Sequence, residues 1–165
     1  MKQVSLQEFQ QLARDIAPAA RAVLMARVYA QMERERVDAY VRPIFDSYGF
    51  VCGSLSDGWR GGPEPGTPIT DMDHLYLCTD DARLAEYYAE CDTAHRAHGF
   101  TGPHGHCPAL TAANMALQVE SALIDLTQPL FGVDSSNLYG ENRKKYLELL
   151  IGACLKAEKE NDRGR

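Results

Sequence analysis

The residues best suited to chemistry in this chain are a group of cysteines and histidines in its middle. Cys91 and His95 are four residues apart, and His98 follows three residues later. In a helix this spacing places all three side chains on one face, with neighbouring Cβ atoms about 5–6 Å apart. A helical Cys-x3-His pair facing a His–Cys pair on a loop can supply the four ligands of a tetrahedral zinc ion. Three further possible ligands follow within a few residues: His104, His106 and Cys107.

A second interpretation of the same residues needs no metal. The helix face that carries Cys91, His95 and His98 also carries Leu84 and Tyr87. Free cysteine is often buried and then behaves as a small apolar residue. The spacing also matches none of the usual paired-cysteine zinc patterns. We therefore favour a packed helix face without a cofactor, and keep a zinc site as the alternative.

Two carboxylates and an imidazole form a second candidate site. Asp71, Asp73 and His74 follow a segment rich in glycine and proline. They could hold a divalent cation, or act as acid and base in a small hydrolase-like enzyme beneath a loop lid. Acidic residues after such a loop more often form turns. Catalytic residues therefore stay unknown, with these three as weak candidates.

A third candidate is a contact site on the glycine- and proline-rich loop itself. Trp59 is the only tryptophan, and Arg60 follows it. Tryptophan and arginine dominate the hot spots of protein interfaces, which favours a partner-binding role for this pair. Alternatively, the aromatic body of Trp59 folds back over the helices.

Several common catalytic signatures are missing. The chain has no phosphate-binding Gly-x4-Gly-Lys-Ser/Thr loop, no Gly-x-Gly-x-x-Gly, no His-Glu-x-x-His, no Gly-x-Ser-x-Gly and no Cys-x-x-Cys. These absences argue against the usual forms of nucleotide binding, metalloproteolysis, ester hydrolysis and thiol redox chemistry. They leave open whether the chain is an unusual enzyme.

The elements that would position these residues are mostly helices. Ser5 and Glu8 form a capping box at the start of the first helix, which we expect to end at Pro18. A long second helix should then run to about residue 48, with a kink or break near Pro43 and its end at Gly49. Its near-heptad apolar spacing favours self-association.

Three more helices are expected, over residues 80–98, 108–130 and 136–158. The second of these is apolar on most sides and should be central, although Glu120 in its middle then needs a partner such as Arg27. The predicted class is mostly α: a bundle of about five helices with a Gly/Pro-rich insert after the second. We expect one domain over 1–158, with the insert at 50–79, including a possible short β-hairpin, and a frayed charged tail at 159–165.

Composition narrows the class of protein further. The chain has 165 residues, 45% hydrophobic and 24% charged, which is the balance of a soluble globular domain. A net charge of −6 argues against general nucleic-acid binding. No apolar run reaches the roughly 18–20 residues that a membrane helix needs, and we expect no signal peptide. Five scattered cysteines suit a reducing, cytoplasmic location.

These observations favour a non-catalytic interaction or accessory protein. It would act through its helix faces and the Trp59 loop, with a protein partner or a second copy of itself bound there. A zinc-binding helical domain is the alternative, and an enzyme using Asp73 and His74 is the weaker third hypothesis.

Overall fold

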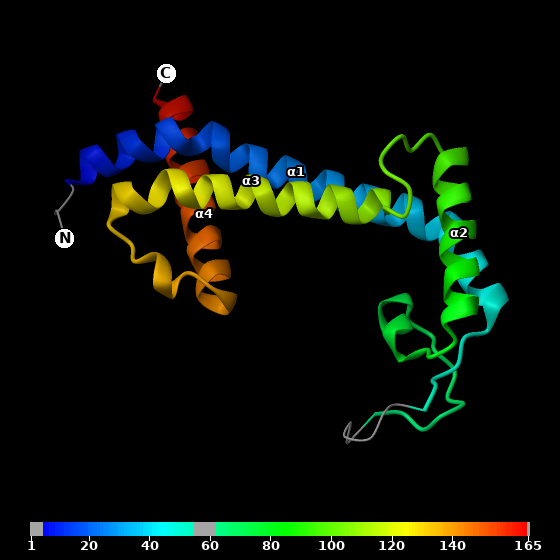
Figure 1. Ribbon diagram of the computed structural model, residues 1–165. Helices are drawn as coiled ribbons and strands as arrows, with labels where there is room; N and C mark the ends of the chain where they lie inside the picture. The colour runs from blue at the N-terminus through cyan, green and yellow to red at the C-terminus, as the bar shows by residue number, and fades with distance from the viewer. Residues whose placement is uncertain (1–4, 55–61, 165) are drawn as a thin grey trace. The chain divides into compact units, whose positions relative to one another are not determined.

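Helices dominate the described part of the chain, which in this computed structural model comprises residues 5–54 and 62–164. The predicted mostly α class, with about five helices, is confirmed (Figure 1). The described residues form four α-helices and two short 3-10 helices: α1 (Leu6–Tyr48), η1 (Met72–Leu77), α2 (Asp81–Ala97), α3 (Pro108–Phe131), η2 (Ser135–Asn137) and α4 (Gly140–Arg163).

The first helix is longer than the sequence suggested. It begins at the predicted capping box, where the Ser5 amide donates to Glu8 Oε2 at 2.8 Å. The predicted helix boundary at Pro18 is wrong, and α1 also continues past Pro43. Proline costs a helix interior about 3 kcal/mol relative to alanine. Burial of neighbours such as Ala17 and Phe45 opposes that cost.

Gly49 ends α1 as predicted. Its φ of 56° lies in the left-handed region, where a side chain would be strained. The chain can therefore turn sharply here and leave the helix direction.

The segment between α1 and α2 is paired differently from the prediction. Val51 forms an isolated antiparallel bridge with Pro68, supported by a 2.8 Å hydrogen bond from the Cys52 amide to the Thr67 carbonyl. Within this insert, for which the sequence allowed a short β-hairpin, residues 72–77 instead form the 3-10 helix η1. Asp71 explains the difference, because its side chain accepts from the Asp73 amide at 3.0 Å and starts that helix.

The chain forms two compact units, and each has its own core. The first unit comprises residues 1–31 and 112–165, and the second comprises residues 32–111. The single domain predicted over 1–158 stays a prediction. The hydrophobic core cluster of the first unit comes from α1, α3 and α4: Ala13, Ile16, Ala17, Ala20, Val23, Leu123, Ile124, Leu147, Leu150, Ile151, Cys154 and Ala157. That of the second unit comes from α1, η1, α2 and the segments around η1: Val37, Val41, Phe45, Phe50, Cys52, Ile69, Leu75, Leu77, Cys78, Tyr87 and Cys91.

The apolar helix α3 is not enclosed. Leu123 and Ile124 are buried in the first unit, whereas Leu117 and Leu126 are about half exposed. The expectation of a central helix therefore fails for the described residues. None of their helices is long and apolar enough to cross a membrane.

Candidate functional site

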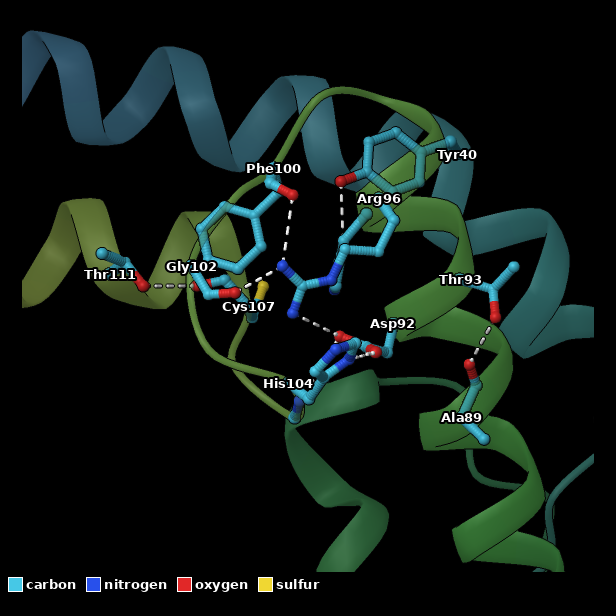
Figure 2. A network of polar contacts seen from close by, with 12 residues as sticks. Tyr40, Ala89, Asp92, Thr93, Arg96, Phe100, Gly102, His104, Cys107 and Thr111 are labelled. Atoms are coloured by element: carbon cyan, nitrogen blue, oxygen red, sulfur yellow. Dashed lines mark hydrogen bonds and ion pairs between the residues drawn. The ribbon is translucent and has the colours of Figure 1, made fainter.

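Asp92 of α2 binds the loop that joins α2 to α3 (Figure 2). Its carboxylate accepts hydrogen bonds from His104 Nδ1 at 2.8 Å, from the Gly105 amide at 3.3 Å and from Arg96 Nη2 at 3.4 Å. The hydrogen bond from His104, helped by the other two donors, holds the pKa of Asp92 below its usual range. The carboxylate is therefore charged at neutral pH and fixes the loop to α2.

Arg96 completes the attachment of this loop from the same helix. Its Nη1 donates to the Phe100 carbonyl at 3.3 Å and also to the Gly102 carbonyl. Its guanidinium lies 5.3 Å from the centre of the Phe100 ring. The buried Nε has no acceptor among the described residues. Arg96 thus satisfies backbone oxygens that the turn would otherwise leave unpaired.

A tyrosine–histidine pair lies beside the loop. The Tyr40 hydroxyl and His95 Nδ1 are 2.7 Å apart, and the His98 ring stacks on Tyr40 with centroids 4.0 Å apart. Burial lowers the pKa of His95 and raises that of Tyr40. Near pH 7 His95 is therefore neutral, and its tautomer decides whether the Tyr40 hydroxyl or Nδ1 donates in this hydrogen bond.

The two cysteines of the predicted zinc site are placed less favourably for a metal. Burial raises the pKa of the Cys91 thiol, so a metal would have to displace its proton on binding. Cys107 is half-buried and immediately precedes α3.

The histidines of the loop point to the same conclusion. His104 is 86% exposed at its side chain, and His106 is exposed as well. Within residues 5–54 and 62–164, no three His, Cys, Asp or Glu side chains come together to hold a metal ion. The zinc site stays a prediction that this geometry does not support.

The second candidate group forms a turn. Asp71 caps η1, and Asp73 is mostly exposed, with a carboxylate oxygen 3.8 Å from Arg34 Nη2. His74 is exposed, and its ring contacts Tyr76 edge-on. These roles suffice to explain the three residues as parts of a loop. Trp59 and Arg60, the predicted partner-binding pair, lie outside the described residues.

An apolar surface on α1 is one of the features that contacts among the described residues leave exposed; α3 carries others, such as Leu117 and Leu126. Met25, Val28 and Tyr29 are 72%, 59% and 50% exposed, and Ala22 beside them is exposed too. We call these four residues the outer stripe. Their spacing of three and four residues places them on one helix face. Val23, in contrast, is fully buried in the core.

Sequence analysis missed the outer stripe because the same helix carries a second apolar pattern. Val23, Ala26 and Ala30 also keep a spacing of three or four residues, and the self-association predicted for this helix rests on that pattern. The signal was nevertheless present, since Ala22, Met25 and Tyr29 repeat the same spacing one position away.

Ion pairs border the outer stripe within the first unit. Arg21 pairs with Glu158 of α4, and Arg27 Nε donates to Glu120 Oε1 of α3 at 2.7 Å. Arg143 Nη2 lies 3.8 Å from the other Glu120 oxygen. The expected partner for Glu120 is thus found in Arg27. These contacts fix α1 against α3 and α4 and so hold the outer stripe in place.

Comparisons with protein-family models, with curated proteins and with solved structures give no match to this chain.

Proposed function

We propose that this chain is a non-catalytic association module that binds another protein through the outer stripe of α1. The supporting observation is the exposure of Met25, Val28 and Tyr29 on a helix whose other face is already buried. Single exposed apolar residues are ordinary, but a group on one rigid helix face is typical of an interaction site.

The energetics favour such a role but also limit it. Burying one large apolar side chain contributes about 1.5–3 kcal/mol. Association costs an estimated 4–15 kcal/mol in lost translational and rotational freedom. The outer stripe therefore serves as the anchor of a contact that needs further residues. We propose the Trp59–Arg60 pair as a separate partner-binding site of its own.

The alternatives have less support. For the zinc hypothesis, His95 and His104 would have to leave Tyr40 and Asp92 before they could bind a metal. For the hydrolase hypothesis, Asp71 is already the cap of η1. His95, His104 and Asp71 thus have structural partners, whereas Met25, Val28 and Tyr29 are exposed among the described residues.

Site-specific photocrosslinking tests the proposal. A photoreactive benzoylphenylalanine would replace Met25, in cells that naturally make the chain. The matched control replaces Leu149 of α4, which is 76% exposed and apolar but is the single large exposed apolar side chain described on its helix. We expect one discrete adduct from position 25 and none from position 149.

A second control tests whether the adduct depends on the stripe. Replacing Val28 and Tyr29 by serine should remove the adduct while helix content by circular dichroism stays unchanged. Equal crosslinking from positions 25 and 149, or none from either, would contradict the proposed function.

A further inference from the structure

We infer that the occupant of the outer stripe is a second copy of this chain, packed antiparallel with its α1 across a two-fold axis at Met25. The inference rests on the proposed function and adds the identity of the partner. It follows from how the side chains of the stripe, and Arg21 next to it, match one another when the helix is paired with itself.

The sizes of the stripe residues are complementary about Met25. When two identical helices pack antiparallel about a two-fold axis, the numbers of two residues that face each other always add up to the same total. With Met25 on the axis that sum is about 50, so Ala22 faces Val28 and lies next to Tyr29 of the other copy. The small, exposed Ala22 leaves a gap into which the larger side chains fit, as helix packing requires.

The same pairing matches a cation with an aromatic ring. The numbers of Arg21 and Tyr29 also add up to 50, so these two residues face each other across the pair. The side chain of Arg21 is 46% exposed, and Tyr29 is 50% exposed. Arginine can hold a carboxylate through the edge of its guanidinium and stack its face on a ring. Arg21 can therefore keep its ion pair with Glu158 while covering Tyr29 of the second copy. The contact occurs twice in the dimer.

The area of the stripe determines how stable the dimer is. Three large side chains and one alanine from each copy place the contact at the low end of interface sizes, below about 1,200 Å² in total. Such an interface gives a reversible dimer that depends on concentration. Each copy carries a net charge of −6, so the two copies repel and added salt should strengthen the dimer.

Cysteine crosslinking of the full chain tests the two-fold axis. A cysteine on the axis lies beside its own copy, so Met25→Cys should form a disulfide-linked dimer under mild oxidation. Leu149→Cys is the matched control, because it is as exposed but belongs to α4 and not to the stripe on α1. The wild-type chain provides the background from native cysteines. Mixing Ala22→Cys with Val28→Cys chains should give a mixed dimer more readily than either chain alone.

Sedimentation equilibrium supplies the independent measurement. We expect reversible dimerisation of the wild-type chain, which tightens as salt rises from 50 to 500 mM. Met25→Glu should weaken it at least tenfold with unchanged helix content, and Tyr29→Ser should weaken it as well.

The inference is overturned if Met25→Cys links no better than Leu149→Cys and the wild-type chain stays monomeric up to several hundred micromolar. If Met25 then photocrosslinks to a different protein, only the second copy is excluded and the proposed function stands. If it crosslinks to nothing, the proposed function fails too.

Discussion

The loop that joins α2 to α3 and the outer stripe of α1 are opposites in the way their side chains are used. The loop region contains the reactive types, and Asp92, Arg96 and His104 bind one another or the backbone. The stripe contains no histidine, cysteine or charged residue, and its Met25 and Val28 side chains are exposed. In this chain the reactive side chains Asp92, Arg96 and His104 therefore make structural contacts, and the candidate binding site is an apolar surface.

The difference has a physical origin. A buried polar group must find a partner, so a histidine such as His95 brings a hydrogen-bonding neighbour with it. An exposed methionine costs little in a folded monomer and needs no neighbour. An exposed methionine indicates an interaction site only when adjacent apolar residues are exposed on the same helix face.

The largest expected effect separates the two faces of α1 itself. Val23→Asp places an unpaired carboxylate in the core of the first unit and should lower the free energy of unfolding by more than about 3 kcal/mol. Met25→Asp, two residues away and exposed, should change it by less than about 0.5 kcal/mol. Urea unfolding followed by circular dichroism measures both. Similar losses would mean that Met25 is covered within the chain, and the comparison would fail.

The next effect tests whether Arg96 holds the loop. Arg96→Met removes the donors to Phe100, Gly102 and Asp92 and should cost about 1–2 kcal/mol, allowing for the partial exposure of the side chain. Arg34→Met is the matched control, because Arg34 is exposed and makes one 3.8 Å pair with Asp73. It should cost less than about 0.5 kcal/mol. Equal unfolding midpoints for the two variants would show that the loop does not depend on Arg96.

A smaller effect concerns pH. The pKa of His95 is lowered in the folded chain, so below its ordinary value of about 6.5 the unfolded chain binds more protons than the folded one. Stability should therefore fall as pH falls from 7 to 5. In His95→Gln this part of the pH dependence should disappear, as measured by thermal melting across that range. An unchanged pH profile would show that His95 is not buried in its neutral form.

The smallest expected effect is that of zinc. Equimolar zinc added to reduced protein should leave the melting temperature unchanged within about 1 °C, since His95 and His104 already have partners. A bound metal at 100 times its dissociation constant would contribute about 2.7 kcal/mol. A clear rise in melting temperature that Cys91→Ser abolishes would reverse the comparison and restore the zinc hypothesis.

Local signals predicted the parts of the fold that depend on neighbours in sequence. The capping box at Ser5 and Glu8 and the helix end at Gly49 need only a few residues, and both are found. The boundary expected at Pro18 failed because burial of residues around it decides the outcome, and burial depends on distant segments.

The candidate site shows the same limit. Helical spacing correctly placed Cys91 and His95 on one buried face of α2. It could not show that the hydroxyl of Tyr40, 55 residues away in sequence, would form a hydrogen bond with His95. Nor could it show which of two apolar patterns on α1 would be covered, because α3 and α4 determine that choice.

The order of the segments along the chain has a consequence for biosynthesis. The second unit, residues 32–111, is inserted between the two segments of the first. A ribosome adding 5–20 residues per second therefore needs on the order of ten seconds to pass through it before α3 begins to emerge. During that interval Ile16 and Val23 of the nascent chain lack the helices that later cover them. The second unit can therefore fold first, whereas the part of α1 that belongs to the first unit gains its core partners only when α3 and α4 have been made.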